Sequence, residues 1–523
     1  MEMRINHTRN PALIVVILAS LTAAGTAWWC MASGVGVSPD SVVYLSAADS
    51  VLAGQGLKSI VHHFTPTFPS RQPLVGFPPT YPLLLSLSGM LSTDRLNSAR
   101  WLHSILFAVN TLLLGMIVYL ATGRSVLATL CATLLFLLSL PVLEIHTMAW
   151  SEAPFIMFLL LAALLLLLHI NGQHYLLLIA AALSASLALT ARYAGVTMLP
   201  PMVMTILLLK NRPLRNRIRD SVILVTIAVV PLAVWLLRNL MVAHSTTSRT
   251  IGFHPIGISE ISNMANALLV FWLPDTGNTY LKIGLLFLCC VLVVAGIVLP
   301  LKDAVKRDQG RKMNSETQLF AAIFIMTYVL FLVAHNSLVN PVAVFESRTV
   351  APACVFGIIL IISVVYGLSR FGNRPALWWG FLALLFPLAS GNAVRATSFV
   401  IQRHDNAIGY TSREWARSET IAYLRTLSDG RTIYSNGIDA IYFLTGRDAL
   451  RIPAKFDPIT GKHNADFERN ISALRIELLQ NRSVVVHFAN IPRRWYLPSK
   501  DELDNYKLPV LIQLDDGVIY GIR

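Results

Sequence analysis

Asp40 is the residue whose type and position are best suited to chemistry, because it closely follows the first long apolar run. A carboxylate can accept a proton from a hydroxyl group or help to hold a metal ion. Ser38 can cap a helix that begins here, and Pro39 suits the first helical position. Asp40 could therefore also serve only to complement the dipole of that helix, since acids are common in a first helical turn. Position alone leaves both interpretations open.

Arg192, Arg348 and Glu152 are the other charged residues placed for chemistry, because each lies at the end of an apolar run. A guanidinium group makes planar, bidentate contacts with phosphate, so the two arginines are candidates for binding a phosphate group. An arginine at the end of a membrane span can instead extend its head into the interface. Glu152 could bind a ligand or a metal ion, or complement the dipole of the helix that it begins.

The composition predicts that the elements positioning these residues lie in a membrane. Of the 523 residues, 55% are hydrophobic and 13% are charged, and the mean hydropathy is +0.60. Soluble domains carry about 25% charged residues, and single cores stop growing near roughly 250–300 residues. The formal net charge of +14 could suggest nucleic-acid binding. Much of that charge lies in short loops between apolar runs, which is typical of a membrane protein and argues against a nucleic-acid partner.

Eleven apolar runs satisfy the rule of about 20 residues per membrane span. They lie at residues 11–31, 99–121, 125–143, 150–170, 174–191, 194–210, 220–240, 281–300, 317–335, 348–369 and 375–396. If the N-terminus is cytoplasmic, the basic loop clusters fall on the inner side only when all eleven spans are kept. These clusters are Arg124, Lys210 to Arg219, Lys302 to Lys312, and Arg370 with Arg374. The sequence thus predicts a multi-pass protein of the cell inner membrane with an extracytoplasmic C-terminal region.

Three outer segments are long enough to hold a site, namely residues 32–98, 241–280 and the tail after residue 396. In the first, Ser38 and Gly54 bracket an expected helix, and its apolar spacing predicts an amphipathic helix on the membrane surface. A short apolar helix is expected at Tyr81–Leu91, entering the interface without crossing it. His62 and His63 are expected to be loop histidines, and Asp275 of the second segment a loop acid.

The tail predicts a small α/β domain. Thr411 with Glu414 forms a capping-box pattern, and Gly430 can end that helix. Strands are expected at three places, the last a hairpin: Arg431–Ser435, Ser483–Phe488, and Leu511–Leu514 with Val518–Ile522.

The predicted fold class is an all-α polytopic membrane protein with a small C-terminal α/β domain. The membrane domain is expected at residues 1–396 and the extracytoplasmic domain at residues 397–523. The five cysteines all fall in apolar runs, so neither a disulfide framework nor a zinc pattern is present. The sequence motifs of soluble nucleotide-binding folds are also absent. This absence points to a substrate delivered within the membrane.

Three motifs, in this order along the chain, resemble those of GT-C glycosyltransferases. The type they resemble is that of protein mannosyltransferases and lipid-A aminoarabinose transferases, glycosyltransferase family 39 and its bacterial relatives. Residues 38–48 (SPDSVVYLSAA), followed by Gly54-Gln55-Gly56, resemble the first outer loop of that family. Residues 77–83 (FPPTYPL) are similar to its PPxYP-like element, and residues 345–352 (FESRTVAP) to its DRYLxPxxP element. Order and topology agree over most of residues 10–395.

The resemblance implies that Asp40 acts as a base or a metal-linked acid, and that the donor is a polyprenyl-phosphate sugar. A single displacement would invert the anomeric carbon. Relatives often carry an acidic pair where this chain has Asp40 and Ser41, so a divalent metal cofactor is in doubt. Arg192 and Arg348 would hold the lipid phosphate. Tyr44, Tyr193 and Glu152 are further candidates for substrate binding, although Tyr193 could instead be an interfacial tyrosine.

Two other functions compete with this interpretation. A transporter or flippase of a lipid-linked sugar would bury ionisable groups at mid-membrane, whereas the candidates here all lie at one predicted interface. A membrane-anchored binding protein could use Trp415, Trp495 and Tyr496 of the tail for sugar stacking, although aromatics in a small domain are usually core. The sequence determines neither the sugar nor whether the acceptor is a glycan, a lipid or a protein.

Overall fold

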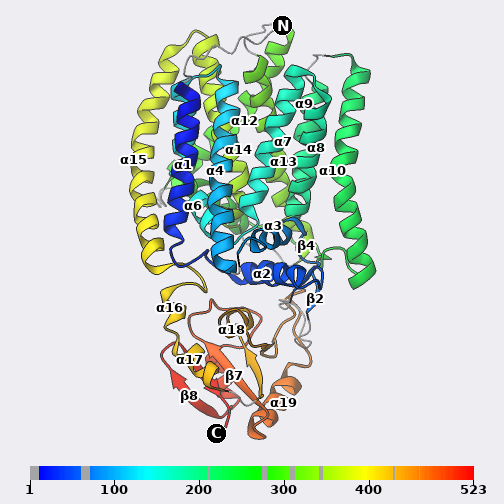
Figure 1. Cartoon of the computed structure of the whole chain (residues 1–523), viewed down its shortest axis with the longest axis vertical. Coiled ribbons are helices and arrows are strands. Elements are labelled where there is room, and N and C mark those ends of the chain that lie inside the picture. The colour runs from blue at the N-terminus through cyan, green and yellow to red at the C-terminus, as the bar shows by residue number, and fades with distance from the viewer. Residues whose placement is uncertain are drawn as a thin grey trace.

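In the computed structural model, the described residues are 11–59, 71–92, 94–208, 212–273, 279–306, 312–340, 345–427, 430–458 and 460–522. They form a bundle of helices with a small α/β domain at one end, which Figure 1 shows below the bundle. This end is called the domain end here, and α1 begins at the opposite end. His62, His63 and Asp275 lie outside the described ranges.

Eight of the described helices are long and apolar enough to cross a membrane. They are α1 (Pro11–Cys30), α4 (Arg95–Ala121), α7 (Glu152–Gly172), α10 (Leu214–Ala243), α12 (Thr279–Lys306), α13 (Lys312–Leu338), α14 (Ser347–Phe371) and α15 (Pro375–Asn406). The bent pair α5 (Val126–Leu137) and α6 (Leu140–Thr147) makes a ninth if it is counted as one span. All eleven predicted spans fall on helices. The count of eleven is not confirmed, because α8 (Tyr175–Ala191) and the pair η1 (Tyr193–Met198) with α9 (Leu199–Leu208) are shorter.

The predicted straight span at 125–143 is instead broken between α5 and α6, which are bent by 62°. Pro141 in the first turn of α6 has no amide hydrogen to continue the α5 ladder, which favours the break. His146 therefore lies in a helix instead of a loop. Its ring is buried, stacks on Phe107 of α4 with centroids 4.4 Å apart, and hydrogen-bonds Asn110 at 2.8 Å.

The end opposite the domain is rich in basic residues. Asp220 of α10 is buried there, and its carboxylate pairs with Arg212 at 2.6 Å. Asn171 of α7 donates to Glu316 of α13 at the same end. Arg124, Arg215, Arg217, Arg219, Lys302, Arg370 and Arg374 also fall at this end by the order of the helices. Such a distribution is typical of a cytoplasmic face.

The first long connection covers the domain end of the bundle. It contains α2 (Pro39–Leu52), the short antiparallel pair β1 (Lys58–Ser59) and β2 (Gln72–Pro73), and α3 (Thr80–Gly89). Figure 1 shows α2 and α3 lying across the helix ends. Both predicted helices are present, but the surface-amphipathic character expected for α2 is wrong. Residues 41–48 are all buried, because α2 packs against α3 and against the domain through α18 (Ile438–Thr445).

The C-terminal domain is built on a five-stranded sheet. Its order is β6 (Leu450–Arg451), β5 (Thr432–Ser435), β7 (Ser483–Phe488), β9 (Gly517–Tyr520) and β8 (Val510–Leu514). Strands β6, β5 and β7 are parallel, whereas β9 runs antiparallel to β7 and β8. The predicted strands and hairpin are confirmed. The sheet carries α17 (Glu419–Thr426), α19 (Phe467–Leu479) and α20 (Lys500–Asn505) in addition to α18.

The predicted capping box at Thr411 is wrong. Ser412 caps the short helix α16 (Arg413–Ala416) and Ser418 caps α17, whereas the Thr411 hydroxyl donates to the Val35 carbonyl at 3.2 Å. The helix cap therefore lies one residue later than predicted, at Ser412, because the Thr411 hydroxyl is used in the contact with Val35. Trp415, proposed above for sugar stacking, is buried in the core.

A backbone contact joins the domain to the first connection. α15 continues to Asn406, and the chain then forms a bridge between Gly409 and Val37, with the Tyr410 amide donating to the Val37 carbonyl at 2.8 Å. Gly409 has φ +63, and a Cβ there would lie 2.0 Å from the Val37 carbonyl oxygen. Glycine is thus required for this close approach.

Candidate functional site

The N-terminus of α2 places Asp40 at the domain end of the bundle. The Ser38 hydroxyl oxygen accepts the Ser41 amide at 3.4 Å and the Trp150 indole N–H at 2.8 Å. The first bond caps the helix, and the second ties it to the connection between α6 and α7. The Asp40 side chain, in the first turn, keeps 32% of its surface exposed. Asp40 is therefore held in place and open to a ligand.

Arg348 meets Asp40 across the bundle, although 308 residues separate them. Its Nη1 lies 3.1 Å from Asp40 Oδ2, and its Nε lies 2.7 Å from Glu346 Oε2. The guanidinium also stands over the Trp150 ring, 4.6 Å from the centroid. This cation–π contact and the two ion pairs fix its orientation.

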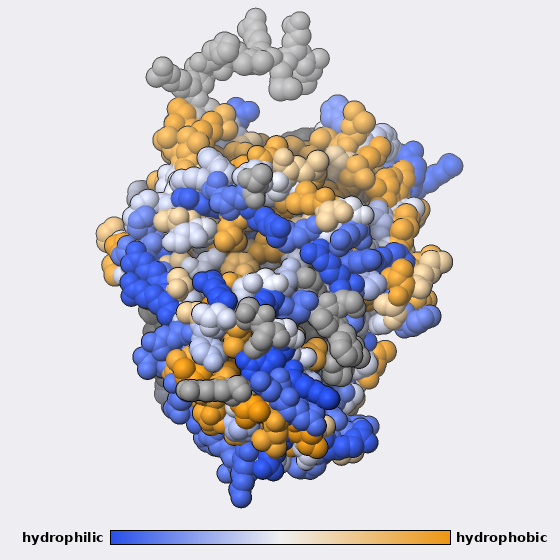
Figure 2. All heavy atoms as spheres, turned by 60° about the horizontal axis from the view of Figure 1, so that its bottom comes forward, coloured by the Kyte–Doolittle hydropathy of each residue, from blue (hydrophilic) through white to orange (hydrophobic). Residues whose placement is uncertain are grey.

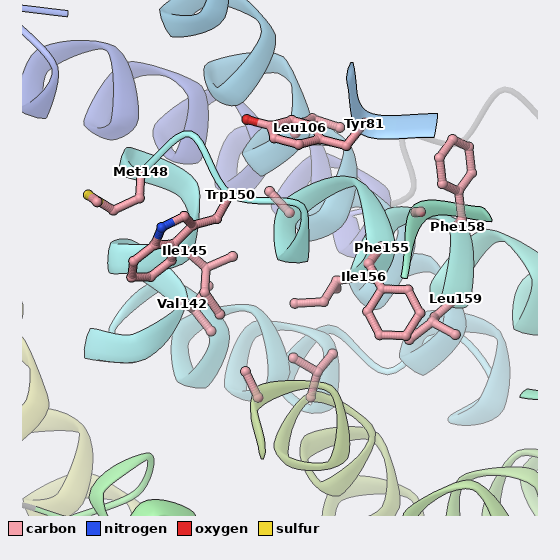
Figure 3. Packing of buried hydrophobic residues seen from close by; sticks show 14 of the residues in the cluster. Tyr81, Leu106, Val142, Ile145, Met148, Trp150, Phe155, Ile156, Phe158 and Leu159 are labelled. Carbon is pink, nitrogen blue, oxygen red and sulfur yellow. The ribbon is translucent and has the colours of Figure 1, made fainter. Parts of the chain in front are cut away.

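Trp150 belongs to a packed apolar floor beneath this ion pair. Figure 3 shows it in one cluster with Val142 and Ile145 of α6 and with Phe155 and Ile156 of α7. All of these side chains are buried. Close packing of this kind resists displacement, so the floor supports the charged groups above it.

Arg192 and Glu152 form the second ion pair of the site. Arg192 Nη1 lies 2.6 Å from Glu152 Oε1 and 3.1 Å from the Ser151 hydroxyl. The Glu152 side chain is only 3% exposed, so the guanidinium balances a carboxylate that water hardly reaches. Arg192 sits where α8 ends and η1 begins, in extended conformation, which turns its side chain out of the helical ladder.

Tyr44 connects α2 to this second pair. Its hydroxyl hydrogen-bonds the Ser151 hydroxyl at 3.1 Å, and its ring packs edge-on against Phe77 and Tyr81 of the PPxYP-like segment. Burial raises the pKa of Tyr44, and the Asp40 and Glu152 carboxylates raise it further against the opposing charge of Arg192. The hydroxyl is thus neutral at physiological pH. Tyr44 is itself buried, so the structure places it behind the site as a support.

Tyr193 is placed beside the site but not with the ion pairs. Its hydroxyl donates to the Val75 carbonyl at 3.0 Å and accepts the Trp235 indole N–H at 3.2 Å. These contacts tie η1 and α10 to the first connection.

Arg249 is a candidate that sequence reasoning missed. It precedes β3 (Thr250–Ile251), which pairs with β4 (Val339–Asn340) at the end of α13 and so holds the second outer segment near the site. Much of the side chain is exposed. Nevertheless, surrounding protein and the like charge of Arg192 lower its pKa, against the attraction of Asp40. Within the described ranges, no hydrogen bond or ion pair of Arg249 is found. Its position in an outer segment was the available signal.

Glu346 was also missed as a site residue, although it lies in the quoted 345–352 motif. It brings the carboxylates to three, with Asp40 and Glu152. In the described part of the chain, no group of three His, Cys, Asp or Glu residues is suited to hold a metal ion. Each of these carboxylates instead contacts an arginine. This donor set does not fit a divalent cation.

The arrangement combines three guanidinium groups with two accessible carboxylates, Asp40 and Glu346. The guanidinium groups of Arg192, Arg249 and Arg348 can bind the oxygens of a phosphate. Asp40 can accept a proton from a hydroxyl group nearby.

Comparisons with known proteins agree with this architecture. Residues 77–235 match the family model described as dolichyl-phosphate-mannose-protein mannosyltransferase. That range includes Glu152, Arg192 and Tyr193 but neither Asp40 nor Arg348. No curated protein sequence matches significantly.

Solved structures of similar fold cover almost the whole chain. ArnT from Cupriavidus metallidurans, apo, has a TM-score of 0.56 at 13% identity, and its complex with undecaprenyl phosphate has 0.51 at 12%; each covers 97% of both chains. The archaeal oligosaccharyltransferase AglB from Archaeoglobus fulgidus, in complex with an inhibitory peptide and a dolichol-phosphate, has 0.54 at 14%. That match covers 91% of this chain and 69% of the other. The chain therefore has the GT-C fold and, over residues 77–235, is similar to the dolichyl-phosphate-mannose-protein mannosyltransferase family.

Proposed function

We propose that the chain transfers a sugar from a polyprenyl-phosphate donor to an acceptor hydroxyl at the outer face of the cell inner membrane. The observation that carries the proposal is the meeting of Asp40 with Arg348 at the domain end of the bundle. A base and a phosphate-binding group lie side by side there, with Arg192 and Arg249 nearby. The two fold relatives with bound polyprenyl phosphates, ArnT and AglB, support the choice of donor.

The reaction is a single displacement. The acceptor oxygen attacks the anomeric carbon, and the bond from that carbon to the phosphate oxygen breaks. Asp40 takes the acceptor proton, and polyprenyl phosphate leaves with the bonding electron pair. One displacement inverts the anomeric carbon.

The guanidinium groups would stabilise the charge that develops on the leaving phosphate. Arg348 is fixed by Glu346 and by the Trp150 ring, and Arg192 by Glu152 and Ser151. Preorganised charges of this kind need no reorganisation when the bond breaks. The buried floor below them excludes water, which strengthens each interaction.

The distribution of basic residues supports the outer orientation. The basic residues at Arg124, from Arg212 to Arg219, and at Arg370 and Arg374 lie at the end of the bundle opposite Asp40. Under the positive-inside rule that end is cytoplasmic, so the site would face outward.

The proposal is tested by comparing Asp40→Asn with Asp49→Asn. Both carboxylates lie on α2 and both pair with an arginine, Asp40 with Arg348 and Asp49 with Arg95. Full-length protein in lipid nanodiscs is given polyprenyl-phosphate sugars and scored for release of polyprenyl phosphate. Loss of a general base is expected to slow Asp40→Asn by about 10²–10⁴-fold, whereas Asp49→Asn keeps near wild-type turnover.

Melting temperature shows that both variants are folded. A folded Asp40→Asn variant that transfers sugar at the full rate rules out the assigned base. If the wild type moves a labelled donor between leaflets without breaking its sugar–phosphate bond, the chain is a flippase and the transferase proposal is wrong.

A further inference from the structure

The parallel part of the domain sheet has a reversal of strand order. β5 lies between β6 and β7, so the chain leaves β5 toward one side and later crosses to the other. In open α/β sheets, ligands bind outside the carboxyl ends of the strands at such a reversal. Asn436 joins the two carboxyl ends here, since its side chain donates to the Phe488 carbonyl and accepts the Phe488 amide, both at 2.9 Å. The edge formed by the carboxyl ends of β6, β5 and β7 is called the carboxyl edge below.

Charged and aromatic side chains follow all three strands at the carboxyl edge. Asp439, after β5, is fully buried, accepts the Tyr410 hydroxyl at 2.5 Å, and pairs with Arg494 Nη2 at 2.8 Å. Arg494 and Tyr496 come after β7. Arg451 ends β6, and its guanidinium lies 5.5 Å from the Tyr496 ring centroid.

Trp495 extends this cluster to the surface. It is 54% exposed, in contrast to the buried Trp415. Its ring centroid lies 5.7 Å from that of Tyr496, nearly perpendicular, and 6.0 Å from that of Phe456. An exposed indole that directly follows Arg494 in the chain offers a stacking face, and Arg451 lies over the neighbouring Tyr496 ring. Figure 2 shows the domain surface as mostly hydrophilic with hydrophobic patches among the polar residues.

The carboxyl edge faces the site on the bundle. Tyr410, which donates to Asp439, also binds the Val37 carbonyl through its amide, next to Ser38 that caps the Asp40 helix. α18, which begins at this edge, packs on α2. Figure 1 shows α18 between the strands and the bundle. A chain of contacts thus runs from Asp40 to Arg494 and its neighbour Trp495.

We propose that the carboxyl edge binds an anionic saccharide, which is the acceptor presented to Asp40. The statement that this saccharide is the acceptor rests on the proposed function. Sugar rings present apolar faces that suit Trp495 and Tyr496, and acidic substituents suit Arg451 and Arg494. Asp439 holds one nitrogen of Arg494, and among the described residues Arg494 has no other side-chain partner. Its side chain is 14% exposed, and a guanidinium group has five N–H donors, so it can also donate to an anionic ligand.

Binding is measured on full-length protein in nanodiscs of neutral lipid without donor. The probes are pentamannose 6-phosphate and neutral mannopentaose. The phosphorylated probe is expected to bind about tenfold or more tightly, with a difference that shrinks at high salt. Trp495→Ala should weaken binding of both probes about tenfold, as for a truncated aromatic anchor, while Trp495→Phe retains most of it. Ile476→Ala, which truncates an equally exposed side chain on α19, is the matched control and should bind as wild type.

Unchanged saccharide binding by Trp495→Ala overturns the proposal. So does a result in which that variant loses binding to anionic-lipid vesicles but keeps saccharide binding, because the edge is then a membrane contact. A wild-type chain that binds the saccharide but releases no polyprenyl phosphate contradicts the transferase proposal and leaves the saccharide site standing.

Discussion

The buried pair of Arg192 and Glu152 allows the structural and the phosphate-binding roles of Arg192 to be separated. The perturbation is the set Arg192→Gln, Glu152→Gln and the double variant. Glu152 is 3% exposed and lies 2.6 Å from the guanidinium. Removing Arg192 alone leaves a buried carboxylate without its partner, which costs about 3–5 kcal/mol of unfolding free energy. Neutralising both removes that penalty, so the double variant should recover most of the lost stability.

Activity should not follow stability. If Arg192 binds the donor phosphate, the double variant still lacks that contact. A hydrogen bond to a charged group contributes about 1.5–3 kcal/mol, which corresponds to roughly 10–150-fold in kcat/KM. The double variant is therefore expected to have a melting temperature near that of the wild type, and to transfer sugar roughly 10–150-fold more slowly.

The assays are thermal unfolding in nanodiscs and steady-state transfer per folded molecule. Arg212→Gln is the matched control, because Arg212 pairs at the same distance, 2.6 Å, with the buried Asp220 at the opposite end of the bundle. It should lose stability and keep turnover. If the Arg192 and Glu152 double variant recovers both stability and activity, Arg192 is only the partner of Glu152, and the phosphate assignment is refuted.

Four further outcomes are expected. Ser38→Ala should lower the unfolding free energy by about 1 kcal/mol and slow transfer, because the cap and the Trp150 bond that place Asp40 are lost; an unchanged rate would contradict that positioning. Gly409→Ala should detach the domain, seen as faster proteolysis, because a Cβ would meet the Val37 carbonyl, whereas Gly430→Ala, with similar φ and open space, should not. Burial and the Glu477 carboxylate raise the pKa of Tyr434 to about 12 from its usual 10. The stability that this residue contributes is therefore present below pH 10 and is lost as the pH rises toward 12. In Tyr434→Phe, the melting temperature of the domain should depend less on pH over that range. Chelation with EDTA should leave the transfer rate unchanged, since the site carboxylates are occupied by arginines; a rate lost on chelation and restored by a divalent ion would contradict this.

Local pattern was sufficient for the elements themselves. Ser38, Pro39 and Gly54 bracket α2 as expected, since capping and chain reversal depend on neighbouring residues only. The strands at 483–488 and at the C-terminal hairpin were predictable from alternation and from Asp515-Asp516-Gly517 between them. The long apolar runs likewise predicted the helices of the bundle, because a span has a minimum length.

Where the pattern failed, a distant contact had competed with it. Burial of both faces of α2 depends on α3 and on α18, which lies nearly 400 residues away. The helix predicted to start at Thr411 starts one residue later, because the Thr411 hydroxyl donates to the Val35 carbonyl instead of capping the helix.

The sequence by itself determined a multi-pass helical protein, its small terminal sheet, and a set of charged residues at helix ends. Only the tertiary structure decided which of these residues meet: Arg348 with Asp40 and Glu346, and Arg192 with Glu152. It also brought Arg249, which no motif marked, toward Asp40 and Arg192. The physical reason is that helix periodicity sets which face of one helix is apolar, whereas the partner of a charge depends on how separate helices pack, and side-chain spacing along the chain carries no record of that.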